Sequence, residues 1–173
     1  MKEQKPMKNQ APNEGKLNKP YIQCINTTCG ARFPITDKII RCPKCSDLLD
    51  IIPSLDKLNP ERMKMVFRQR RASLNPLDIS GVWRYREFLP FSGEDLNYVV
   101  TLGEGNSPIL DAPKSAGYAG LKNLKIKHLG WNPSGSFKDH GMTVAVTQAR
   151  RLGSKIVACA STGNTSASIC LLY

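Results

Sequence analysis

Four cysteines lie within one 22-residue stretch, in a spacing typical of metal ligands: Cys24-x4-Cys29, twelve residues, then Cys42-x2-Cys45. Four thiolates at about 2.3 Å in a tetrahedron leave no position for water, so the metal that fits them is a structural zinc ion. The alternative is a module of four reduced cysteines without a metal. Residues 1–20 contain no apolar stretch that could serve as a signal peptide, which favours reduced thiols over a secreted disulfide framework.

A second candidate is a lysine at the predicted start of a helix. Residues 132–141 read Asn-Pro-Ser-Gly-Ser-Phe-Lys-Asp-His-Gly, and their Gly-Ser-rich turn places Lys138 beside the positive end of the helix. That field and partial burial disfavour the ammonium form, and an amine of lowered pKa suits covalent catalysis. The ordinary alternative is a lysine that reaches into solvent.

A third candidate is a hydroxyl-rich loop between a predicted strand and a predicted helix. Hydroxyls and free N–H groups at a helix N-terminus can bind a carboxylate or a phosphate. The alternative is a simple N-cap and turn, because the same residue types are common in both. The loop consists of Ser161, Thr162, Gly163, Asn164 and Thr165.

The elements that must position these groups alternate between strand and helix. We predict strands at 124–129 and 155–160, a helix at 139–152 that ends before Gly153, and another helix from 165 onward. This order indicates a parallel α/β sheet. The 139–152 helix is expected to bury Met142, Ala145, Val146, Ala149 and Leu152, and to turn Thr143, Thr147, Arg150 and Arg151 away.

The region before this unit contains one further predicted helix. Asn59-Pro60-Glu61 is typical of a helix start, and Asn75-Pro76 is expected to end the element that runs to about Arg71. This helix should bury Met63, Val66 and Phe67, with a solvated face formed by Arg62, Lys64, Arg68, Arg70 and Arg71. Residues 81–90 are aromatic and basic, and they are interpreted as a packing segment. Short β-prone pieces at 38–40 and 48–52 flank the cysteines.

Composition restricts the remaining possibilities. The chain has 173 residues, 40% of them hydrophobic, and a formal net charge of +11. Such a charge is compatible with nucleic acid, an anionic membrane surface or an anionic substrate. Its spread over a polar tail, residues 1–19, and one helix face makes nucleic acid the weaker candidate. No apolar run approaches the length of a membrane helix, so we expect a cytoplasmic protein without a membrane partner.

Together and in this order, these motifs resemble the fold-type-II pyridoxal-phosphate enzymes, and the threonine synthase family most closely. The loop at 102–108, Leu-Gly-Glu-Gly-Asn-Ser-Pro, and the segment Gly-Val-Trp-Arg-Tyr at 81–85 also resemble this family. The resemblance implies an α/β fold with a tryptophan-synthase-β-like parallel sheet, preceded by a small four-cysteine zinc ribbon. The expected parts are a disordered tail at 1–19, the ribbon at 20–53 and part of a catalytic domain at 54–173.

The resemblance also implies roles for individual residues. Lys138 would bind pyridoxal 5'-phosphate covalently and act in catalysis, and Asn164 would contact the cofactor. The substrate carboxylate would be held by Ser161, Thr162, Gly163 and Thr165. The implied reaction converts O-phospho-L-homoserine and water to L-threonine and phosphate, in a full-length homodimer. His140 occupies a position where many relatives have arginine.

Three alternatives remain open at this point. A threonine or serine dehydratase, or a cysteate synthase, would use the same lysine and loop on another substrate. A zinc-ribbon nucleic-acid-binding protein would explain the cysteines and the charge, but not Lys138. The helix from 165 stops abruptly, and two strands do not make a covered sheet, so we expect an incomplete chain that is inactive by itself. The third alternative is a non-catalytic fragment in which only the ribbon keeps a stable fold.

Overall fold

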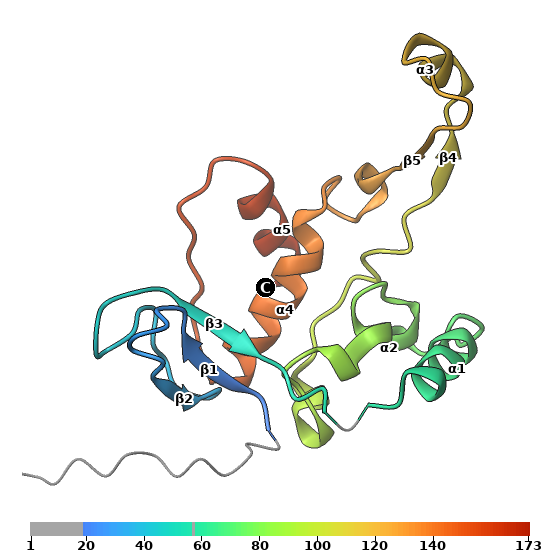
Figure 1. The fold of residues 1–173 in the computed structure, drawn as a ribbon. Helices are drawn as coiled ribbons and strands as arrows, with labels where there is room; N and C mark the ends of the chain where they lie inside the picture. The colour runs from blue at the N-terminus through green and yellow to red at the C-terminus, as the bar shows by residue number, and fades with distance from the viewer. Residues whose placement is uncertain (1–18, 57) are drawn as a thin grey trace, which may run out of the picture.

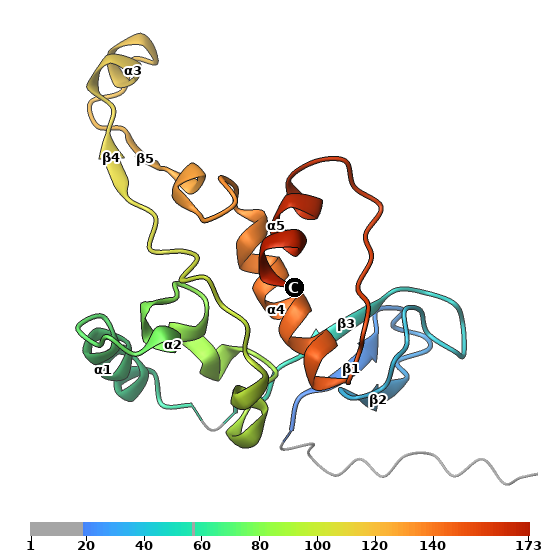
Figure 2. The same cartoon turned by 180° about the vertical axis from the view of Figure 1, so that it is seen from behind.

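The computed structural model describes residues 19–56 and 58–173. Within them lie two small antiparallel sheets, a series of short helices and a packed pair of longer helices (Figures 1 and 2). The predicted disordered tail at 1–19 falls outside the described residues, apart from Lys19. No helix in the described ranges combines the length and the apolar character needed to cross a membrane.

The first sheet carries the cysteine-rich segment. Its strands are β1 (Tyr21–Cys24), β2 (Arg32–Pro34) and β3 (Leu49–Ile52), in the order β2-β1-β3 with antiparallel pairing throughout. Gly30 has a φ of +52°, which permits the tight turn between β1 and β2. The predicted β-prone piece at 48–52 is therefore confirmed as β3, whereas residues 38–40 form no strand.

Short helices connect this sheet to the later part of the chain. They are α1 (Pro60–Arg70), α2 (Pro76–Ile79) and the 3-10 helices η1 (Trp83–Phe88) and η2 (Gly93–Tyr98). The predicted start of α1 is confirmed, because the Asn59 side chain accepts a hydrogen bond from the Arg62 N–H at 2.9 Å. The predicted end near Arg71 is confirmed, because α1 ends at Arg70, but Asn75 and Pro76 are not what stops it. Asn75 instead caps α2 by accepting from the Leu77 N–H at 2.9 Å.

Helix α1 differs from its prediction in how its side chains are distributed. Met63, Val66 and Phe67 are only half-buried, and no residue of α1 is fully buried. Arg70, assigned to a solvated face, instead packs against η1 and pairs with Glu87 at 2.5 Å. An arginine stem can cover apolar surface while its guanidinium pairs with a carboxylate, and hydrophobic periodicity does not detect this.

A two-stranded arm projects away from the rest of the molecule (Figure 1). Strands β4 (Ile109–Asp111) and β5 (Lys125–Lys127) pair antiparallel, and α3 (Pro113–Tyr118) forms the tip. The chain then passes through η3 (Leu129–Trp131) to the long helices. The strand predicted at 124–129 thus exists in shortened form, but its partner is the neighbouring hairpin strand.

Helices α4 (Lys138–Arg151) and α5 (Asn164–Leu172) pack side by side and begin at the same end of the pair (Figures 1 and 2). Both match their predicted positions to within one or two residues. Gly153, with a φ of +68°, follows α4 as its predicted terminator. The opposite end of α4 lies near the first sheet, where Gln148 Nε2 donates to the Ile35 carbonyl at 3.0 Å.

The predicted buried face of α4 is partly wrong. Thr143 and Thr147, expected to face outward, have no exposed surface, while Ala145 is exposed and Val146 is buried as expected. The reason is hydrogen bonding: Thr143 Oγ1 donates to the Val100 carbonyl at 2.6 Å, and Thr147 Oγ1 accepts from the Val100 N–H at 3.1 Å. A β-branched residue whose hydroxyl is bonded packs as an apolar one would.

The predicted strand at 155–160 is not formed. These residues are largely exposed, and Ile156 retains 83% of its surface. A strand requires a neighbour to pair with its N–H and C=O groups, and none lies alongside this segment in the described structure. Accordingly, no parallel pairing occurs among the described residues, and the parallel sheet is absent from them.

Candidate functional site

The four cysteine sulfurs come together between β1 and the loop before β3. Their Sγ atoms all lie within 4.8 Å of one another, with Cys24 to Cys45 at 3.4 Å and Cys29 to Cys42 at 3.8 Å. These separations exceed the roughly 2.05 Å of a disulfide bond, and all four thiols are free. A tetrahedron of sulfurs at about 2.3 Å from a zinc ion has edges of roughly 3.8 Å. The arrangement therefore fits a four-thiolate metal site.

The four neighbouring thiols influence one another's pKa: that of Cys42 is lowered, whereas those of Cys24 and Cys45 are raised, that of Cys45 to about 12. Burial by itself raises the pKa of the Cys42 thiol, but hydrogen bonds from the backbone of Lys44 and Cys45, with those from neighbouring thiols, outweigh it and lower the pKa to about 7. The thiolate is the form that ligates a metal. Cys24 and Cys42 are buried and Cys29 is half-buried, while Cys45 is exposed, so the cluster lies at the edge of the small sheet.

Lys138 occupies the first position of α4 and is half-buried. Its Nζ lies 4.6 Å from the centroid of the Phe137 ring, and no carboxylate pairs with it in the described part of the chain. The backbone N–H of Lys138 donates to Ser136 Oγ at 3.2 Å, which holds the turn that precedes the helix. The amine is thus available at a helix start and is not committed to an ion pair.

Asp139 fixes the turn that carries Lys138. Its carboxylate accepts from the Ser134 N–H at 2.8 Å and from the Ser134 hydroxyl at 2.5 Å. Burial alone raises the pKa of Asp139, yet these hydrogen bonds, with smaller effects of Ser168 and His140, hold the pKa below its usual range. An ionised carboxylate in the first turn also suits the helix dipole.

His140 connects this turn to the glycine-rich loop at 102–108. Its Nε2 lies 3.0 Å from Asn132 Oδ1, which also accepts the N–H of Gly105 at 2.8 Å. Asn132 Nδ2 donates to the Leu129 carbonyl at 2.7 Å, and only 4% of the residue is exposed. His140 is therefore held by a hydrogen bond within the fold, and Asn132 is the residue that joins the two motifs.

The segment at 161–165 leads into α5, whose first two residues are Asn164 and Thr165. The Gly163 N–H donates to Ser161 Oγ at 3.2 Å, and the Ser166 hydroxyl donates to the Ser161 carbonyl. Gly163 is the N-cap of α5 and provides no side-chain cap, so the first N–H groups of α5 remain open to a ligand. Because α4 and α5 begin at the same end, Lys138 and this loop lie at the starts of two adjacent helices (Figure 2). Thr162, Gly163 and Asn164 are exposed, while Ser161 and Thr165 are half-buried.

Sequence reasoning missed Glu104, a carboxylate that organises the glycine-rich loop from inside. Only 1% of Glu104 is exposed, and its oxygens accept from Ser80 Oγ at 2.5 Å, from Thr101 Oγ1 at 2.9 Å and from the Leu102 N–H at 3.0 Å. The Glu104 carbonyl accepts the Gly81 N–H at 2.6 Å. In the sequence, the position of this glutamate between two glycines is the signal that could have indicated its role.

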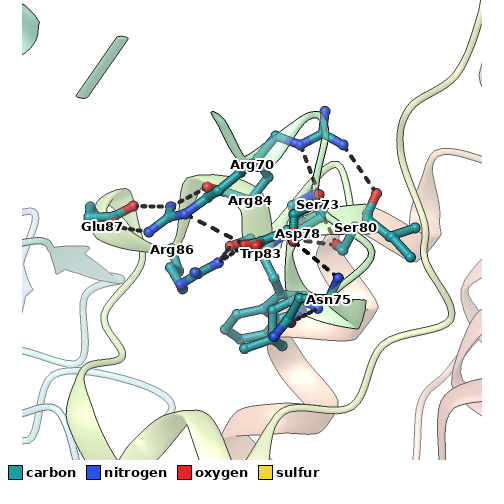
Figure 3. A network of polar contacts seen from close by, with 12 residues as sticks. Arg70, Ser73, Asn75, Asp78, Ser80, Trp83, Arg84, Arg86 and Glu87 are labelled. Carbon is teal, nitrogen blue, oxygen red and sulfur yellow. Dashed lines mark hydrogen bonds and ion pairs between the residues drawn. The ribbon is translucent and has the colours of Figure 1, made fainter. Parts of the chain in front are cut away.

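An ion-pair network around α2 and η1 was also not predicted (Figure 3). Asp78 Oδ1 lies 2.8 Å from Arg86 and 3.6 Å from Arg70, and Arg70 also contacts Glu87. Burial raises the pKa of Asp78, but hydrogen bonds from Arg86 and Ser73 and the two guanidinium charges outweigh it and lower that pKa. The network locks α1 onto the segment that leads to the glycine-rich loop.

Comparison with known proteins identifies the family. Residues 100–172, which contain Lys138 and the 161–165 loop, match the family described as pyridoxal-phosphate dependent enzyme. This part of the chain is similar to that family. The predictions of a pyridoxal-phosphate-dependent enzyme family and of a mixed α/β fold preceded by a cysteine cluster are therefore confirmed.

The matches to individual proteins cover more of the chain. It is 40% identical over 153 residues to threonine synthase of Methanosarcina acetivorans and 40% identical over 147 residues to that of Methanocaldococcus jannaschii. These matches cover 87% and 85% of this chain, and 33% of each relative. Threonine synthase of Synechocystis is 52% identical over 86 residues, which is 49% of this chain and 22% of that protein. The chain thus spans about one third of the length of the archaeal relatives.

Proposed function

We propose that this chain is part of a threonine synthase, which converts O-phospho-L-homoserine and water to L-threonine and phosphate. The observation that carries the proposal is the placement of Lys138. Its amine has no acidic partner in the described structure and lies at the start of α4, at the same end of the helix pair as the uncapped start of α5. The similarity to three threonine synthases supports this substrate over that of a dehydratase or a cysteate synthase.

These residues fit a pyridoxal-phosphate cofactor in their chemistry. Lys138 would hold the cofactor covalently, and Asn164, an exposed amide at the first position of α5, would contact it. When bound, the cofactor supplies an electron sink next to the reacting carbons. Lys138 is the general base and acid that takes and returns protons at Cα and Cβ of the substrate.

The loop before α5 would bind the substrate carboxylate. Ser161, Thr162, Gly163 and Thr165 offer hydroxyl and backbone N–H donors at a helix N-terminus, where the helix dipole favours an anion. The donors lie within five successive positions of the chain, so together they can orient the amino acid with its reacting carbons toward Lys138. This loop determines how the substrate is held, and Lys138 moves its protons.

We further propose that the cysteine cluster at Cys24, Cys29, Cys42 and Cys45 binds one zinc ion. The proximity of four free sulfurs supports a structural site. The 20–53 segment has few buried apolar residues, and a metal would compensate for this small core. The homodimeric state, the absence of a nucleic-acid partner and the cytoplasmic location stay predictions.

The test of the cofactor assignment locates the reactive lysine directly. The longer protein that carries this chain is incubated with pyridoxal 5'-phosphate, reduced with borohydride and digested, and the modified peptide is identified by mass. We expect the label on Lys138 and its loss in Lys138→Ala, together with loss of phosphate release from O-phospho-L-homoserine. Lys155→Ala, at an exposed lysine outside the site, is the matched control. A label that persists in Lys138→Ala would overturn the assignment.

A further inference from the structure

A cavity of about 560 Å³ opens between η1, the glycine-rich loop and the base of the arm. None of its lining residues is acidic, whereas three of them are lysine or arginine: Arg71, Arg84 and Lys127. The cavity also contains His140, two positions after Lys138. Its size lies within the range of roughly 300–1,000 Å³ that is usual for small-molecule sites.

Arg84 is the most unusual residue of this cavity. Only 6% of it is exposed, and its guanidinium donates to the carbonyls of Asp78 at 2.9 Å and Ile79 at 3.4 Å (Figure 3). No carboxylate forms an ion pair with it among the described residues. A buried guanidinium without a counter-ion is unfavourable, because backbone carbonyls compensate only part of its lost hydration.

The neighbouring acids are already bound to other arginines. Asp78 pairs with Arg86 and Arg70, and Glu87 pairs with Arg70. The Arg84 guanidinium instead binds the carbonyls at the end of α2, and Figure 3 shows it apart from the contact between Arg70 and Glu87. Arg84 therefore lines the cavity without an anionic partner from this network.

Ser107 provides a second, independent indication of a ligand. The residue lines the cavity and is 7% exposed, yet its hydroxyl is buried and lacks a hydrogen-bond partner in the described structure. Buried hydroxyls are normally bonded, so an unpartnered one signals a missing group. Lys127 Nζ donates to the Ser107 carbonyl at 3.0 Å, which fixes the ammonium at the same rim of the cavity.

We propose that this cavity binds the phosphate group of a small organic phosphate. Three cations and a hydroxyl donor match the several oxygens and the double negative charge of a phosphate monoester better than they match a carboxylate. The volume exceeds that of phosphate alone, and Tyr85, Pro108 and Ile109 supply apolar contacts for the attached organic part. The phosphate belongs either to the substrate of the proposed reaction or to a separate phosphorylated ligand.

This proposal does not rest on the role of Lys138, because it concerns binding without cofactor. Inorganic phosphate is titrated into the 173-residue chain at constant ionic strength, with sodium chloride as the compensating salt, and amide chemical shifts are followed by NMR. We expect saturating shifts of Gly105, Asn106 and Ser107. Lys138→Ala should titrate like the parent, which separates the cavity from the proposed cofactor site.

The decisive variants change cavity charge. Arg84→Gln should weaken phosphate binding on the order of tenfold, and Lys127→Gln, at an exposed residue, should weaken it severalfold. Arg68→Gln removes a charge from the exposed face of α1 and is the control. The proposal would be overturned if sodium chloride alone caused the same chemical-shift changes as phosphate. It would also be overturned if Lys127→Gln bound phosphate as tightly as the parent. Displacement of phosphate by O-phospho-L-homoserine at the same amides identifies the substrate as its source, and failure to displace it identifies a separate ligand.

Discussion

The indole Nε1 of Trp83 donates a hydrogen bond to Thr143 Oγ1 at 2.8 Å, although the two residues are 60 positions apart in the chain. Both are fully buried, and Thr143 passes the bond on to the Val100 carbonyl at 2.6 Å. Helix α4, which begins with Lys138, is thereby joined to η1 and to the segment before the glycine-rich loop. The position of the candidate catalytic lysine depends on a polar contact in the core.

Removal of this hydroxyl should destabilise the fold. Thr143→Val keeps the shape but leaves the indole N–H and the Val100 carbonyl without a partner, at a cost of about 1–3 kcal/mol for each buried group. Chemical denaturation followed by tryptophan fluorescence measures the change. Thr143→Ser retains the hydroxyl and should lose less. Equal stabilities of the two variants would show that the hydrogen bonds are not the cause.

A methyl group at Gly81 should disrupt the glycine-rich loop. A Cβ added there would lie 2.6 Å from the Asn106 nitrogen and 2.7 Å from the Gly105 Cα, and both are backbone atoms that cannot rotate away. We therefore expect Gly81→Ala to lower the melting temperature and to shift the amides of Gly105 and Asn106. Gly117→Ala, where a Cβ meets nothing within 4 Å, should be neutral or slightly stabilising. A stable Gly81→Ala with unchanged spectra would contradict the close contact.

Acid should weaken the turn that carries Lys138. The pKa of Asp139 is lowered in the folded chain, so its contribution to the free energy of unfolding is present above the unfolded-state pKa of about 4 and is lost as the pH falls through the lower, folded value. Asp139→Asn should therefore be less stable than the parent at pH 7, with the gap narrowing toward pH 3. Denaturant titrations across this range measure the gap. Asp37→Asn, at an exposed position, is the control, and a gap in Asp139→Asn that does not change with pH would refute the argument.

Metal analysis should find one zinc ion per chain. Replacing Cys42 by serine removes the buried ligand whose pKa is lowered to about 7, and should abolish stoichiometric zinc in the purified protein. A chelator should likewise reduce the protection of the β1–β3 sheet in hydrogen exchange, because the four sulfurs connect its ends. Cys170→Ser, at an exposed cysteine of α5, should retain the metal. Full zinc content in Cys42→Ser would disprove a four-thiolate site.

Local signals predicted those parts of the structure that local interactions determine. Asn59 and Pro60 mark the start of α1, the glycine-serine turn marks the start of α4, and the cysteine spacing brings four sulfurs together. Each of these features depends on residues close in sequence. For the same reason, the bounds of α4 and α5 were predicted nearly correctly.

Features that depend on distant partners were not predictable. The buried side of α4 was misassigned because Thr143 and Thr147 bond to Val100, more than forty positions away. Arg84 was read only as part of a basic packing segment, since nothing in its neighbourhood shows that α2 carbonyls bury it. The segment at 155–160 has a strand-like composition, but pairing requires a neighbour that composition does not reveal.

The contact between Gly81 and Gly105 has a consequence for how this protein can change over evolution. The backbones of these two glycines touch, so a side chain at either position would clash with the other backbone. A replacement at one position would therefore require the other loop to move at the same time. Both glycines should therefore stay unchanged in evolution while residues on the surrounding surface vary. In homologous proteins the two positions should be inherited as a unit, with the loop that forms the cavity wall.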